Sequence, residues 1–276
     1  MSADQQQSWV ENRAGGLSIL PLTELRGSGE LVAFFALRDL QVRYKQAVLG
    51  VLWVVLQPLV TVAAFTLAFD RLADVGTGDL PYPVFALAGL LAWTYVSQCV
   101  SRGSEVLVTN PALITKVYVP RLVTPIASLL PGLVDLGVGL VLLAVFCVLY
   151  GVGPGVAVLL APVWLVLLLL TALGPVLLLA AVNVRFRDVR YLVPPLLQAM
   201  LFLSPVAYSG NGLGGAARLL YAANPVVGAL ELGRFVLVGA PWPGRPLAVS
   251  ATSAGLLAIA GLAYFQHAQR SFADVI

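Results

Sequence analysis

The stretch from residue 136 to residue 184 constrains this chain more than any other feature. Its 49 residues contain no Asp, Glu, Lys or Arg, and a Gly-Val-Gly-Pro-Gly sequence interrupts them at 151–155. A bilayer core takes about 20 apolar residues per helix, and sequences rich in Gly and Pro mark turns. The stretch therefore predicts two membrane spans joined by a hairpin. The chain as a whole is predicted to be a polytopic membrane protein.

The rest of the chain has the same character, with a mean hydropathy of +0.92 and only 11% charged residues, against roughly a quarter in soluble domains. We expect an all-α fold, with a flexible N-terminus (1–29), a transmembrane domain (30–265) and a polar tail (266–276). Because 46 mostly polar residues precede the first hydrophobic segment, it is expected to stay as an anchor and not to be cleaved as a signal peptide. The gaps between charges predict six transmembrane helices, near 47–69, 80–101, 121–149, 156–182, 193–208 and 247–265.

The basic residues predict the topology. Six spans place both termini on one side, and with that topology 12 of the 16 Lys and Arg residues lie on the side of the termini. Since Lys and Arg accumulate in cytoplasmic loops, both termini are predicted to be cytoplasmic. The pI of about 9.0 is thus explained by topology and contact with membrane lipids, and nothing in the pattern of basic and aromatic residues suggests nucleic acid.

Two cytoplasmic segments have helical character. Residues 30–46 contain no Gly or Pro, and Phe34, Leu37, Leu40 and Tyr44 share one side at helical spacing, which favours an amphipathic helix on the membrane surface. The alternative is an ordinary extension of the first span.

The second of these segments is the loop 102–121. It contains Asn110-Pro111, which suits a helix start. A short helix over 111–118 would present Lys116 and Tyr118 to the cytoplasm, and the alternative is a solvated connector.

The segment between the fifth and sixth predicted spans, 209–246, is too interrupted for a span and too apolar for an open loop. We expect short re-entrant helices there, because such helices are tolerated where protein covers them.

Few chemically active side chains lie inside the predicted spans. Asp135 lies about halfway along the third, and a single acid favours an interhelical hydrogen bond or a partner site over an ion relay. Cys99 and Cys147 are expected only to pack. His267 has no neighbouring ligand residues, so no metal site is expected.

A more specific signal is a stripe in the first span. Trp53, Gln57, Thr61 and Phe65 recur every four residues and so share a slowly drifting helix face. Aromatic rings and neutral hydrogen-bonding groups suit sugars, whose CH faces stack while their hydroxyls need partners. Gln198 and Phe202 repeat the spacing in the fifth span, followed by Ser204 and Tyr208. The alternative is plain helix packing and interface anchoring.

Short motifs recur along the chain from about residue 30 to its end. They are 38–46 (RDLQVRYKQ), 49–53, 56–59, 81–83, 89–93, 116–121 (KVYVPR), 183–191 (NVRFRDVRY), 204–206, 224–225 and 272–276. In this order they resemble the membrane subunit of bacterial polysaccharide ABC exporters of the ABC-2 type, which move O-antigen, teichoic acid and related lipid-linked glycans.

The resemblance implies a homodimeric permease in the bacterial inner membrane, with the glycan path between the two subunits. It implies that each subunit binds a cytoplasmic ATPase through the interfacial helix and the second-to-third loop, with Arg43, Lys45, Pro111, Lys116 and Tyr118 as coupling residues. The chain has no G-x-x-x-x-G-K-S/T phosphate loop, so ATP and Mg²⁺ belong to the partner and no cofactor is expected here. The expected path residues are Trp53, Gln57, Thr61, Phe65, Phe202 and Tyr208.

Two rival classes remain at this stage. A permease for drugs or lipids would share the spans but need an apolar cavity. An integral-membrane enzyme acting on lipids would need clustered His, Asp or Glu at the membrane surface, and the nearest cluster, Arg185, Arg187, Asp188 and Arg190, reads as a topological anchor and cytoplasmic contact.

Overall fold

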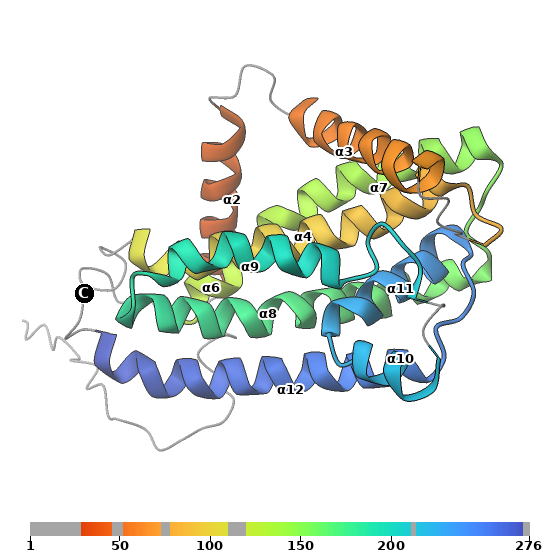
Figure 1. Cartoon of the computed structure of the whole chain (residues 1–276). Helices are drawn as coiled ribbons and strands as arrows, with labels where there is room; N and C mark the ends of the chain where they lie inside the picture. Colours follow the sequence, from red (N-terminus) through yellow and green to blue (C-terminus); the bar gives the residue numbers. More distant parts are fainter. Residues whose placement is uncertain (1–28, 46–51, 73–77, 110–119, 211–213, 273–276) are drawn as a thin grey trace, which may run out of the picture.

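The computed structural model describes residues 29–45, 52–72, 78–109, 120–210 and 214–272, and within these ranges every regular element is a helix (Figure 1). Three short segments extend neighbouring helices: the π-helical η1 (Thr66–Leu72) after α3, and the 3-10 helices η2 (Val156–Leu160) and η4 (Gln269–Ser271). The α-helices are α2 (Gly29–Lys45), α3 (Leu52–Phe65), α4 (Tyr82–Thr109), α6 (Val123–Ala127), α7 (Leu130–Tyr150), α8 (Ala161–Arg185), α9 (Val189–Leu203), α10 (Gly215–Tyr221), α11 (Pro225–Val238) and α12 (Arg245–Ala268).

Five helical stretches in the described ranges are long and apolar enough to cross a bilayer. They correspond to the predicted first, second, third, fourth and sixth spans. The third combines α6 with α7, and the fourth begins with η2. Their bounds are Leu52–Arg71, Tyr82–Thr109, Val123–Tyr150, Val156–Arg185 and Arg245–Ala268.

The predicted fifth span is not confirmed. The helix in that region, α9, has 15 residues, which makes it about 22 Å long at 1.5 Å per residue, against a hydrocarbon core of about 30 Å. It contains Pro194 and Pro195, and the chain becomes extended at Ser204. The number of full-length spans is therefore five in the described part of the chain, and a further crossing by the predicted fifth span remains a prediction.

The helix α8 lies between α4 and α12, and the three run side by side along most of their length (Figure 1). α12 approaches α8 so closely that a methyl group on Gly261 would lie 2.5 Å from the Gly174 carbonyl oxygen. The same group on Gly174 would lie 2.7 Å from the backbone of Leu257. Small residues at helix crossings permit this close packing in membranes.

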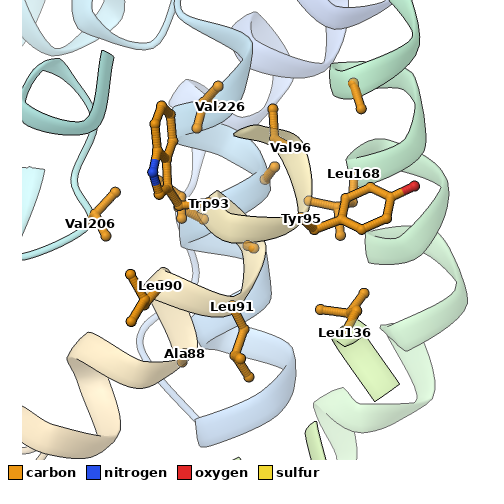
Figure 2. Close-up of a cluster of buried hydrophobic side chains, with 14 of the residues drawn as sticks. Ala88, Leu90, Leu91, Trp93, Tyr95, Val96, Leu136, Leu168, Val206 and Val226 are labelled. Carbon is orange, nitrogen blue, oxygen red and sulfur yellow. The ribbon is translucent and has the colours of Figure 1, made fainter. Parts of the chain in front are cut away.

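The main core gathers around α4, which is mostly buried. Figure 2 shows side chains of α4, among them Trp93, Tyr95 and Val96, surrounded by residues of other elements. These include Leu136 of α7, Leu168 of α8 and Val226 of α11. In an apolar segment of 18 residues taken from each span, 78% of the segment is buried in α4, whereas only 11% is buried in the stretch that begins with α3. α4 is thus the centre of the bundle, and α3 lies at its edge.

The region after α9 forms the two short helices α10 and α11. Asn224 caps the start of α11, and its side-chain oxygen accepts from the Val226 amide at 3.0 Å; Gly239, with a φ of 72°, caps the end of the helix. It packs against α4, α8 and α12, and Trp164 of α8 donates its indole N–H to the Ala229 carbonyl at 2.9 Å. Short, covered helices are what the sequence predicts here, and their re-entrant path in a bilayer stays a prediction.

The helix α2 runs crosswise to α4, α8 and α12 (Figure 1). Its buried anchor is Phe35, 6% exposed, which packs against Val123 and Ala127 of α6. Phe34 and Leu37, which belong to the predicted apolar stripe, are 62% and 58% exposed. The helix is present over nearly the predicted range, while its position on a membrane surface stays a prediction.

Segments predicted to share the cytoplasmic side meet at one end of the bundle. Arg121 donates to the Gln269 carbonyl, and Asn183, fully buried at the end of α8, donates to the Ser104 carbonyl at 2.8 Å. The predicted tail continues α12 through η4, and Phe272 packs edge-on against Phe265. The side of the membrane on which this end of the bundle lies stays a prediction.

Candidate functional site

A cavity with polar and apolar walls, here called the central cavity, lies between α3, α4 and α7 and has a volume of about 410 Å³. Cavities of this size and mixed polarity are typical of ligand sites. α3 contributes Trp53, Val54, Gln57, Pro58 and Thr61; α4 contributes Leu90, Leu91, Trp93, Thr94, Tyr95, Ser97 and Gln98; α7 contributes Gly132, Asp135, Leu136 and Gly139; and α9 contributes Leu201.

The α3 wall brings together three residues of the predicted stripe. Trp53, Gln57 and Thr61 succeed one another at one-turn intervals, so their side chains lie along one face. Thr61 donates its hydroxyl to the Gln57 carbonyl at 2.9 Å. Trp53 is 54% exposed, which places its ring at the rim of the cavity.

The α4 wall supplies polar groups that the sequence analysis did not single out. Thr94 and Gln98 are four residues apart and both line the cavity. Ser97 donates its hydroxyl to the Thr94 carbonyl at 3.2 Å, and the buried Tyr95 donates to the Leu129 carbonyl at 3.3 Å. Polar residues repeating at helical spacing inside an apolar span were the signal that would have identified this wall.

The α7 wall carries Asp135, which is 8% exposed and lines the cavity. Two glycines flank it and bring α7 close to α4. A methyl group on Gly132 would lie 3.1 Å from the Tyr95 ring, and one on Gly139 would overlap the Leu91 side chain. The close approach of the two helices sets the carboxylate against the polar face of α4.

Three predicted path residues lie outside this cavity. Phe65 packs against the main core and lies edge-on to Phe69, with ring centres 5.7 Å apart. Phe202 is 58% exposed on α9. Tyr208 follows α9, where its hydroxyl donates to the Phe202 carbonyl at 2.8 Å and lies 3.0 Å from the Tyr221 hydroxyl. The structure thus gathers half of the predicted set at one place.

A second cavity, here called the α2-side cavity, has a volume of about 570 Å³ and contains most of the nearby charge. Arg38 pairs with Asp39 at 2.9 Å and lies over the Phe35 ring. The two cavities follow each other along α4, with Gln98 in the first and Arg102 in the second. The lining residues of the α2-side cavity are Arg38, Asp39, Val42, Arg102, Glu105, Val106, Thr109, Ser128 and Pro131.

The described part of the structure does not test the predicted coupling residues. Pro111, Lys116 and Tyr118 fall within 110–119, which is not described. Arg43 and Lys45 belong to the last turn of α2, but their side chains are not described either. Their role stays a prediction.

Comparison with known proteins gives a consistent result. Residues 30–238 match the family model described as ABC-2 type transporter. The O-antigen export system permease protein RfbA of Myxococcus xanthus is 30% identical over 242 residues, which cover 87% of this chain and 92% of the relative. Two proteins of the same name from Klebsiella pneumoniae are 22% and 24% identical, each over 90% of this chain and 95% of the relative.

Proposed function

The chain belongs to the ABC-2 type transporter family, and from this premise we propose that it is the permease subunit of an ATP-driven exporter of polysaccharide. Its similarity to three O-antigen export permeases over most of their length supports this assignment. The substrate is a lipid-linked glycan, of the O-antigen or teichoic acid kind, that passes from the cytoplasm across the inner membrane.

The central cavity is the observation that carries the proposal. A glycan cannot cross hydrocarbon unaided, because its hydroxyl groups would lose their hydrogen bonds to water. Trp53 and Trp93 offer aromatic faces to sugar rings, while Gln57, Thr94 and Gln98 offer hydrogen-bonding groups. A cavity for a drug or a lipid tail would not need this concentration of polar groups inside apolar helices.

The exporter requires a separate ATPase, which uses ATP and Mg²⁺, since the permease only transmits the movement. We place the contact on α2 and on the 110–119 segment, with Arg43, Lys45, Pro111, Lys116 and Tyr118. Phe35 supports this arrangement, because its packing against Val123 and Ala127 joins α2 to the start of the third span. A movement of α2 caused by the ATPase would then displace the helices that line both cavities.

The permease is a homodimer with both termini in the cytoplasm. The basic residues support the orientation, since the six-span topology would place 12 of the 16 Lys and Arg residues on the side of the termini. α3 supports the dimer, because most of its apolar surface is uncovered within one chain. A second copy along α3 and α9 would enclose the space next to the central cavity and bring Phe202 and Tyr208 near the path.

The proposal is tested by removing the α3 wall of the cavity. Cells that produce the double variant Trp53→Ala, Gln57→Ala should show about fivefold less surface polysaccharide at equal permease levels, because stacking and hydrogen bonding are both lost. The matched control is Leu256→Ala, Ile259→Ala, two exposed apolar residues of α12. Wild-type export by the cavity variant would exclude the central cavity as the path.

A further inference from the structure

The turn that joins α8 to α9 gathers positive charge at the surface of the bundle (Figure 1). Three residues connect the end of α8 to the start of α9. Arg185, Arg187 and Arg190 are all exposed, and the acid among them, Asp188, is exposed as well. This segment, residues 185–191, is here called the arginine turn. Its three basic groups outnumber its one acid, so it carries a net positive charge.

The guanidinium groups of the arginine turn are not neutralised by carboxylates. Within the residues that the structure describes, none of the three forms an ion pair, not even with the adjacent Asp188. Their contacts are with aromatic rings instead. Arg185 lies 5.4 Å from the centre of the Phe186 ring, and Arg190 lies 4.6 Å from that of Tyr191. Arg190 also donates to the Tyr191 hydroxyl at 2.6 Å. The positive charge is therefore available to a partner.

Two buried valines hold the arginine turn in place. Val189 and Val193 belong to the main core, whereas the rings of Phe186 and Tyr191 are exposed. The Val189 amide donates to the Phe186 carbonyl at 3.1 Å, which closes the turn. The core thus fixes the backbone, and the arginines and rings remain at the surface.

The arginine turn follows directly on a membrane span. The fourth span, Val156–Arg185, ends at the first of the three arginines, and the helix that follows is apolar again. A connection of three residues reaches at most about 11 Å when extended, so the turn must stay near the level where the span leaves the hydrocarbon. Exposed aromatic rings and basic side chains are typical of this level. The planar guanidinium group also matches two oxygens of a phosphate at once.

We propose that the arginine turn binds the phosphate groups of anionic phospholipids through Arg185, Arg187 and Arg190, with Phe186 and Tyr191 at the depth of the headgroups. The charge of the turn is complementary to these lipids, and its position at the end of a span brings it to them. A bound lipid fixes the end of α8 and the start of α9 at the membrane surface. The proposal goes beyond the proposed function, because it does not depend on which solute the permease exports.

The test measures lipid binding to the full-length permease, assembled with its ATPase in a non-ionic detergent. The probes are phosphatidylglycerol, which is anionic, and phosphatidylcholine, which has no net charge, each with a fluorescent acyl chain whose anisotropy gives Kd. A basic residue near an anionic lipid surface contributes about a fivefold preference. With one of three arginines offset by Asp188, the wild type should bind phosphatidylglycerol roughly 25-fold more tightly. Raising NaCl to about 1 M should remove most of this preference, because the Debye length falls to about 3 Å.

The decisive variant replaces all three arginines of the turn with Gln and should bind the two lipids about equally. The matched control removes three other exposed arginines and should keep the wild-type ratio of Kd values; it is Arg71→Gln, Arg245→Gln, Arg270→Gln. Replacing the three arginines of the turn with Lys keeps the charge and should retain most of the ratio. An unchanged ratio in the Gln variant, or an equal loss in the control, would overturn the proposal.

A single variant covers the case in which the triple Gln variant does not fold. Arg187 makes no hydrogen bond or ion pair within the described part of the chain, so Arg187→Gln removes a charge without removing an internal contact. It should lower the ratio of Kd values about fivefold. A wild-type ratio in Arg187→Gln, together with a salt-independent ratio in the wild type, would exclude the arginine turn as the lipid site.

The isolated permease distinguishes a lipid from an acidic surface of the ATPase as the partner. The same preference for phosphatidylglycerol with and without the ATPase supports the proposal. A preference that disappears when the ATPase binds would assign the arginine turn to the ATPase and overturn it, as would equal binding of the two lipids by the wild type. Either failure leaves the proposed function standing, because the Trp53→Ala, Gln57→Ala variant tests that function by export.

Discussion

The guanidinium carbon of Arg234 lies 3.6 Å from the centre of the Phe85 ring, and its Nε donates to the Phe85 carbonyl oxygen at 3.2 Å. A second nitrogen of the same group donates to the Val206 carbonyl at 2.7 Å. One buried side chain of α11 thus binds both α4 and the extended segment after α9. Gly89, one turn along α4 from Phe85, leaves the room that the guanidinium occupies.

Replacing Arg234 with Met should destabilise the permease by about 2–4 kcal/mol, because two buried carbonyls lose their donors. Arg234→Lys should recover only part of the loss, since an ammonium lacks the planar fork of the guanidinium. Thermal unfolding of the detergent-solubilised protein measures both effects. Arg245→Ala, which changes an exposed arginine at the start of α12, serves as the control. Equal midpoints for Arg234→Met and the control would show that the Arg234 contacts contribute nothing to stability.

The crossing of α8 and α12 makes a second prediction, about Gly261. Gly261→Ala should lower the free energy of unfolding by about 1–3 kcal/mol, because the added methyl group would overlap the Gly174 carbonyl and force the helices apart. A methyl group on Gly255 of the same helix would meet nothing within 4 Å, so Gly255→Ala should be neutral or stabilise by up to about 1 kcal/mol through helix propensity. Unfolding midpoints that fall equally for both variants would contradict the close crossing.

The sequence predicted the long helices because each depends on one strong local signal, an uninterrupted apolar stretch of bilayer length. It placed the fifth span near 193–208, whereas α9 covers Val189–Leu203, because the chain becomes extended at Ser204. This is an effect of backbone geometry that hydropathy alone does not register. α11 carries a clear start at Asn224-Pro225 and stop at Gly239, and for that reason its existence was predictable.

The candidate site was half predictable for a geometric reason. Four-residue steps advance by about 40° more than a full turn, so Phe65 lies about 120° around the helix from Trp53, and it contacts the core instead of the cavity. Tyr208 does not continue the α9 spacing, because α9 ends at Leu203. Asp135 was visible in the sequence, but only the packing of α7 on α4 reveals that it faces a cavity.

The predicted topology is tested by labelling single cysteines in a variant that lacks Cys99 and Cys147. Thr109 is exposed at the end of α4, and Gly214 is exposed before α10. A membrane-impermeant thiol reagent added to intact cells with a permeabilised outer membrane should react with Gly214→Cys and not with Thr109→Cys. Lysed cells, in which both should react, provide the control. Reaction of both sites in intact cells would exclude the proposed orientation.

The last prediction concerns the connection between α2 and the bundle. Phe35 packs against Val123 and Ala127 and is covered by Arg38, whereas the adjacent Phe34 is exposed. Phe35→Ala should leave a cavity that weakens the packing of α2 on α6 by about 3–5 kcal/mol, so that α2 separates from α6. Export should then fall, while the partner continues to hydrolyse ATP without transport. Phe34→Ala removes the same ring from the next position and should export normally.

Two measurements on the same cells distinguish this uncoupling from simple misfolding. Permease level and insertion should be equal for Phe35→Ala and Phe34→Ala, while the polysaccharide exported per ATP hydrolysed in membrane vesicles should fall only for Phe35→Ala. If both variants retain the wild-type ratio, α2 does not transmit the movement through Phe35. The coupling would then have to pass through the 110–119 segment, because that is the other cytoplasmic contact proposed for the ATPase.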